Sequence, residues 1–134
     1  MFSKAKEMID ENLMTMSRIF DLQRIEPKPR IKKQMWVKDV GYDEAPWYQE
    51  RMGLTELEDF LSVAAERIDY VKITTTQVLN HPSNWVNRKI ELYKKHSVQP
   101  YLDHGYFVRA YRNGVVDKAI EAGAELGFSV MEFM

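Results

Sequence analysis

The apolar positions of the first 22 residues recur every three or four residues, which is the period of an α-helix. The pattern predicts a methionine-rich helix over Ser3–Leu22. Pro27 and Pro29 then disfavour helix at the preceding residues and each removes a backbone donor, so we expect an extended connector that runs to Lys33. We expect its basic side chains to be solvated, with a phosphate site as the alternative: Lys28, Arg30, Lys32 and Lys33.

Four short segments further along have the apolar, β-branched or alternating character of strands. They lie near residues 34–40, 70–75, 98–102 and 128–133. The last three start at Tyr70, Val98 and Phe128, which are 28 and 30 residues apart. Parallel strands need a crossover of about a dozen residues or more, and each interval has room for a helix. This rhythm predicts an α/β fold of parallel βα units.

Helical patterns fill the intervals between the expected strands. Thr55 and Glu58 have the spacing of a capping box, and we expect the helix that they open to run to about Arg67. Gly127 is in the position of a C-terminal stop for the last helix. The other expected helical segments begin at His81-Pro82-Ser83, cover Tyr106–Arg112 and cover Val115–Leu126.

The length of 134 residues favours one domain, or part of one. We therefore divide the chain into an N-terminal helix with its connector, residues 1–33, and a βα domain, residues 34–134. The last strand ends the chain in an apolar segment, although a central parallel strand needs cover on both faces and pairing on both edges. We expect a truncated chain, a fragment of a longer gene product, a homo-oligomer or a chain completed by a missing half.

Charge and composition exclude several partners. Nineteen basic and 20 acidic residues leave a formal charge of −1, so we expect no nucleic-acid binding. No apolar run approaches the roughly 18 residues that cross a bilayer, and the N-terminus lacks the apolar core of a signal peptide, so we expect no membrane association. The chain has no cysteine, which agrees with a cytoplasmic location and leaves no thiolate chemistry.

Three passages between Asp39 and Glu132 resemble the phosphosulfolactate synthase family. The first is Leu57-Glu-Asp-Phe-Leu with Ile68-Asp-Tyr-Val-Lys72; the second is Lys89-Ile-Glu-Leu-Tyr-Lys-Lys-His96; the third is Ala110-Tyr-Arg-Asn-Gly114 with Glu125-Leu-Gly-Phe-Ser-Val-Met-Glu132. The resemblance implies the first half of a (β/α)8 TIM barrel. It also implies an enzyme that adds sulfite to phosphoenolpyruvate with magnesium, on the way to coenzyme M.

The chain departs from the family pattern at four places. Val40 stands where the family has the Lys of Asp-Lys-Gly, and Thr74–Val78 replaces a glycine-rich GWGTS. Leu102-Asp-His-Gly105 replaces PGGT, and Val108 replaces a Glu. Backbone amides of glycine-rich loops let anionic oxygens approach closely, so these changes bear directly on phosphate binding.

In a barrel of this kind, functional groups collect at the carboxyl ends of the strands. This rule selects Asp39, Lys72, Asp103, His104 and Glu132. Lys72 could hold an anionic substrate or act as a base, with an internal structural ion pair as the alternative. Asp103 and His104 could act as a general acid and base, although adjacent side chains usually point apart.

The remaining candidates concern the metal and the substrate. The carboxylates of Asp39 and Glu132 could hold magnesium, with loop capping and an exposed chain end as the respective structural alternatives. Thr74, Thr76 and Gly105 are candidate contacts for a small anionic substrate, with a strand end as the alternative for the threonines.

Two functions of different classes remain. The first is a divergent phosphosulfolactate synthase-like enzyme, a carbon–sulfur lyase acting on a small anionic acid. The second is a non-catalytic remnant or assembly module that has lost its phosphate-binding loops. Survival of Asp39, Lys72 and Glu132 favours the first, and the missing glycines favour the second.

Overall fold

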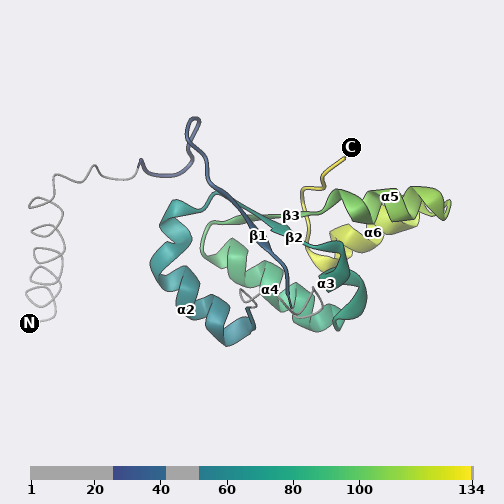
Figure 1. Cartoon of the computed structure of the whole chain (residues 1–134), viewed down its shortest axis with the longest axis horizontal. Helices are drawn as coiled ribbons and strands as arrows, with labels where there is room; N and C mark the ends of the chain where they lie inside the picture. The colour runs from purple at the N-terminus through teal and green to yellow at the C-terminus, as the bar shows by residue number, and fades with distance from the viewer. Residues whose placement is uncertain (1–25, 42–51, 134) are drawn as a thin grey trace, which may run out of the picture.

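The structure, a computed structural model, describes residues 26–41 and 52–133 (Figure 1). The expected helix over Ser3–Leu22 lies outside the described residues. The elements, in chain order, are β1 (Trp36–Asp39), α2 (Leu54–Ala64), η1 (Ala65–Arg67), β2 (Tyr70–Ile73), α3 (Thr75–Asn80), α4 (Ser83–Lys95), β3 (Gln99–Leu102), α5 (His104–Arg112) and α6 (Val116–Leu126).

The three strands form one parallel sheet in the order β1-β2-β3. Lys38 pairs with Lys72, and Lys72 pairs with Tyr101, so the three strands are aligned without a shift at this level. The predicted parallel βα units are therefore confirmed for these strands. A closed barrel is not formed by the described residues, whose sheet has three strands.

One face of the sheet makes the core. Side chains of successive strand residues point to opposite faces, and the set that includes Val71, Ile73 and Leu102 is fully buried. α2 and α4 cover this face, as Figure 1 shows, and contribute Leu57, Leu61, Val86, Ile90 and Tyr93 to the same cluster. The opposite face is more open, and Trp36 on it is 54% exposed.

Two predicted elements differ from the sequence expectation. The predicted second strand stops at Ile73, because Thr75 starts the six-residue helix α3, which the β-branched run Thr74–Thr76 had concealed. The predicted fourth strand, 128–133, is present only as a parallel bridge between Leu102 and Met131. Its place beside β3 is right, but a ladder along its length is not formed.

The helix caps were predicted with mixed success. The capping box expected at Thr55 and Glu58 is wrong by two residues, because α2 begins after Gly53 and the Gly53 amide donates to the Glu56 carboxylate at 2.9 Å. Gly127 ends α6 as predicted, with a positive φ of 121° that a side chain would disfavour.

The connector is only partly solvated, because Lys32 and Lys33 are exposed as expected but Arg30 is buried and Lys28 is half-buried. Arg30 is 6% exposed, and it forms an ion pair with Asp69 directly before β2. Lys28 donates to the Ser97 carbonyl at 2.7 Å. The sequence showed the positive charges of the connector but not the buried carboxylate that accepts one of them.

Gly41 is required by both its conformation and its neighbour. Its φ is +66°, and a Cβ there would lie 2.2 Å from Cγ of the fully buried Gln77. We expect Gly41→Ala to lower the free energy of unfolding by about 2 kcal/mol, through left-handed backbone strain and overpacking. Urea denaturation followed by circular dichroism would measure this. The exposed Gly114 also has a positive φ but nothing within 4 Å, so Gly114→Ala should cost less, and equal losses would contradict the steric part of the argument.

Candidate functional site

Four of the five side chains selected from the sequence converge at the carboxyl ends of β2 and β3. Lys72 Nζ lies 2.8 Å from Glu132 Oε2, and His104 Nδ1 lies 3.3 Å from the same oxygen. His104 Nδ1 is also 3.0 Å from Asp103 Oδ1. We call Lys72, Asp103, His104 and Glu132 the strand-end cluster.

Backbone contacts fix the members of the strand-end cluster. Lys72 belongs to the face of β2 opposite the core. Asp103 directly follows β3 and caps α5 by accepting from the Gly105 amide at 3.3 Å, which makes His104 the first residue of that helix. Glu132 is held beside β3 because its amide donates to the Leu102 carbonyl at 2.9 Å. The cluster therefore depends on the pairing of the last segment with β3.

The charges of Lys72 and Glu132 support one another. The hydrogen bond with Glu132 raises the pKa of Lys72 above its ordinary value, against the opposing effect of burial. The hydrogen bond from Lys72 is also the largest of the effects that lower the pKa of Glu132, and the backbone amide and imidazole of His104 add to it. Both groups are therefore charged at neutral pH. Lys72 is a cation suited to an anionic ligand rather than a neutral base.

Asp39 is not part of this cluster. Its carboxylate is 1% exposed and points into the core face, where Lys89 Nζ lies 2.9 Å from Oδ1 and the Tyr93 hydroxyl donates to Oδ2 at 2.7 Å. Gln77 and the Gly41 amide also donate to Oδ1. Asp39 and Glu132 thus stand in separate environments, and the two were expected to share a metal ion.

The expected substrate contacts have different surroundings. Thr74 is buried, and its hydroxyl is 3.4 Å from the Val40 carbonyl. Thr76 is exposed, and its hydroxyl donates to that of Thr74 at 3.2 Å. Gly105 lies at the start of α5, and a Cβ there would be 3.0 Å from the Thr75 hydroxyl. Of these residues, Gly105 is nearest in sequence to the strand-end cluster.

Sequence reasoning did not select the aromatic side chains beside the cluster. Trp36 stacks on Tyr70 with ring centroids 4.1 Å apart and meets Tyr101 edge-on at 5.4 Å. Lys72 Nζ lies 5.8 Å from the centre of the Tyr101 ring. The alternation of these residues with Val37 and Val71 was the available signal, because it places them on the face that Lys72 shares.

Lys89 and Tyr93 were also missed as partners of Asp39. Lys89 lies on the apolar face of α4 with Val86, Ile90 and Tyr93, and it is fully buried. A lysine in the middle of a buried helical face needs an acidic partner. The sequence therefore indicated that Lys89 has an acidic partner, but it did not identify Asp39 as that partner.

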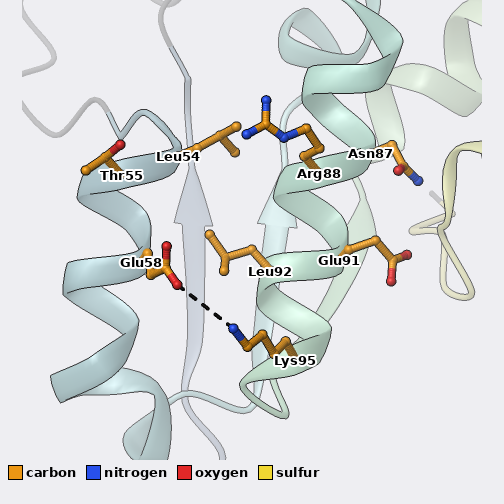
Figure 2. Close-up of a pocket in the computed structure, with 8 residues that line it drawn as sticks. All are labelled: Leu54, Thr55, Glu58, Asn87, Arg88, Glu91, Leu92 and Lys95. Carbon is orange, nitrogen blue, oxygen red and sulfur yellow. Dashed lines mark ion pairs between the residues drawn. The ribbon is translucent and has the colours of Figure 1, made fainter.

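A hollow between two helices lies away from the strand ends. Figure 2 shows it between α2 and α4, where Glu58 and Lys95 approach to 3.9 Å. Its lining residues all come from these two helices, on the covered side of the sheet. Its ion pair joins two exposed side chains and is worth little, so we do not place the functional site there.

Parallel strands joined by helices, with charged groups gathered at their carboxyl ends, define an α/β protein built of (β/α) units, consistent with part of a TIM-barrel-like fold. The model of the family described as (2R)-phospho-3-sulfolactate synthase (ComA) matches residues 23–134, and the chain belongs to this family.

A curated relative agrees with the family assignment. The phosphosulfolactate synthase of Methanothermobacter thermautotrophicus (strain Delta H) is 25% identical over 105 residues, which cover 78% of this chain. The match spans 37% of that relative's length. In the part of the chain that the structure describes, no helix has the length and apolar character needed to cross a membrane.

Proposed function

We propose that the strand-end cluster is the site of a phosphosulfolactate synthase-type reaction, in which a carbon–sulfur lyase acts on a small anionic acid such as phosphoenolpyruvate. The observation that carries the proposal is the position of Lys72, at the carboxyl end of β2 and beside Glu132. Membership of the family supports the same reaction type, and with it a role in sulfonate metabolism and coenzyme M biosynthesis.

Lys72 is the residue that would bind the anion. Its side chain is 22% exposed, so it is reachable from solvent while most of its length is packed. Its raised pKa keeps it cationic, and an incoming carboxylate or phosphate would compete with Glu132 for the ammonium group. Gly105, Thr74 and Thr76 are the proposed neighbours of the bound anion.

Magnesium, which the family resemblance implies, fits the carboxylate oxygens of Asp103 and Glu132, and when bound it would supply positive charge toward the anionic substrate. Asp39 does not fit this role, because its oxygens already accept from Lys89, Tyr93 and Gln77. The protein residues themselves hold and orient the substrate through the Lys72 cation.

We expect magnesium with phosphoenolpyruvate to raise the melting temperature of the protein. A ligand at ten times its dissociation constant stabilises the folded state by about 1.4 kcal/mol, which corresponds to a shift of roughly 4 °C or more for a domain of this size. Thermal melts with and without the two ligands measure this. Lys72→Met should abolish the part of the shift that phosphoenolpyruvate adds to that of magnesium alone.

A matched control is Lys95→Met. It removes the same charge from an exposed site on α4 whose partner is Glu58, and it should leave the shift intact. Equal shifts in wild type and Lys72→Met would place the anion elsewhere and overturn the assignment.

The second candidate is a non-catalytic assembly module. The observation that favours it is the open sheet face, where Trp36 is 54% exposed although it stacks on Tyr70. In addition, the helix α3 stands where the family has its glycine-rich loop, so this chain has a helix in place of that loop. Absence of any ligand-induced shift in the wild-type protein would favour this second function.

A further inference from the structure

The strand-end cluster contains three groups of the kinds that bind metal ions. One ligand atom from each of Asp103, His104 and Glu132 can be chosen so that all lie within 4.8 Å of one another. His104 Nδ1 faces both carboxylates, at 3.0 Å from Asp103 Oδ1 and 3.3 Å from Glu132 Oε2. The three ligands come from two segments, the start of α5 and the end of the chain's last segment. The two carboxylates carry two negative charges, which a divalent cation would neutralise.

The position of these groups does not depend on flexible side chains alone. Asp103 and His104 are fixed by the start of α5, and Glu132 is fixed by two backbone hydrogen bonds that join residues 130 and 132 to Leu102. The His104 amide also donates to Glu132 Oε2 at 3.3 Å. The three ligands are thus held close together across 28 residues of sequence before any ion binds.

The site is a feature of this chain rather than of its family's loop pattern. Asp103 and His104 occur in Leu102-Asp-His-Gly105, the segment that stands where the resemblance to the family has PGGT. Two of the three ligands therefore lie in a loop that has diverged. A nitrogen ligand also changes the preferred ion, because magnesium favours oxygen ligands alone while imidazole suits iron, nickel, copper or zinc.

We propose that Asp103, His104 and Glu132 bind a divalent transition-metal ion, with His104 coordinating through Nδ1. Ion binding takes Glu132 Oε2 from Lys72, whose ammonium lies 2.8 Å away, so Lys72 and the metal compete for one oxygen. His104 then serves as a ligand, which replaces the acid–base role expected for the Asp103–His104 pair. The inference concerns metal binding alone and holds whether or not the protein is a lyase.

Cobalt(II) is the probe, because its visible absorption reports nitrogen coordination and its binding is measured without any substrate. We expect one cobalt ion per chain, competed by zinc more effectively than by magnesium. His104→Ala and Glu132→Gln should each weaken binding by at least about tenfold, as judged from titration calorimetry. Circular dichroism would verify that each variant is folded.

Lys72→Met gives a second test that does not require loss of a ligand. Removing the competing ammonium should tighten cobalt binding, whereas an unspecific surface site would not respond. His81→Gln is the control, since His81 packs against Trp85 outside the cluster. Unchanged affinity in His104→Ala, or unchanged or weaker binding in Lys72→Met, would overturn the proposal. Failure of the phosphoenolpyruvate shift with intact cobalt binding would count against the lyase function and leave the metal site standing.

Discussion

Replacing Lys89 by methionine should lower the free energy of unfolding by about 3–5 kcal/mol, because the Asp39 carboxylate would remain buried without its cation. The two charged side chains are 0% and 1% exposed, and Lys89 also donates to Gln77 Oε1 and the Met52 carbonyl. Burial lowers the pKa of Lys89, and the Asp39 carboxylate opposes that effect. Urea denaturation at neutral pH measures the loss.

A double-mutant cycle separates the pair from general packing. Asp39→Asn alone should also lower the free energy of unfolding. The double variant Asp39→Asn/Lys89→Met should lose less than the sum of the two single losses, because neither charge is then buried without its partner. Lys95→Met on the exposed side of the same helix should change stability by less than about 0.5 kcal/mol. Additive losses in the cycle would mean that Asp39 and Lys89 do not act as a pair.

Replacing Arg30 by methionine should cost about 3 kcal/mol for the same reason, at the amino end of the sheet, where Asp69 directly precedes β2. Arg30 Nε lies 3.1 Å from both oxygens of Asp69, which is 8% exposed and also accepts from the Met35 amide at 2.8 Å. The guanidinium further donates to the carbonyls of Glu26 and Glu66. Its loss would detach the connector and leave the Asp69 charge poorly compensated.

The pH dependence of the Arg30 variant supplies the second part of this test. Burial by itself would raise the pKa of Asp69, but the Met35 amide and the Arg30 guanidinium outweigh it and hold the pKa below the ordinary value. The stability that Asp69 contributes is therefore present above the unfolded carboxyl pKa and is lost as the pH falls through the lower folded value.

In Arg30→Met, the Asp69 pKa rises, and protonation relieves the uncompensated charge. The difference in melting temperature between wild type and variant should shrink in acid. Lys32→Met, in the same connector but exposed, should show no such difference at any pH. A wild-type-to-variant gap that widens in acid would reverse the assigned role of Asp69.

Most of the candidate site could be found from the sequence, because functional groups of parallel βα units gather at the carboxyl ends of the strands. Once Tyr70, Val98 and Phe128 were taken as strand starts, the carboxyl ends selected Lys72, Asp103, His104 and Glu132, which the structure brings together. The rule could not supply distances. It also gave no reason to expect that one glutamate oxygen would receive both Lys72 and His104.

Local propensity failed where tertiary contacts decide the conformation. Thr74–Thr76 is β-forming by composition, yet Thr74 precedes α3 and only Thr75 and Thr76 are helical. The segment 128–133 has strand character, but among the described residues it makes a single bridge, at Met131. A strand needs a neighbouring strand along its whole length to form a hydrogen-bonded ladder, and the local pattern of apolar residues does not show whether such a neighbour is present.

The order of the three strands, their parallel sense, the helices between them other than α3, and the gathering of charges at the strand ends followed from the spacing of apolar residues, because a crossover of helical length leaves few other arrangements. The face that each strand residue takes was decided only in three dimensions. Asp39 is in register with Ile73 and joins the core, while its neighbour Lys38 is in register with Lys72. Side chains alternate along a strand, so a shift of one residue separates a buried ion pair from a group on the open face of the sheet.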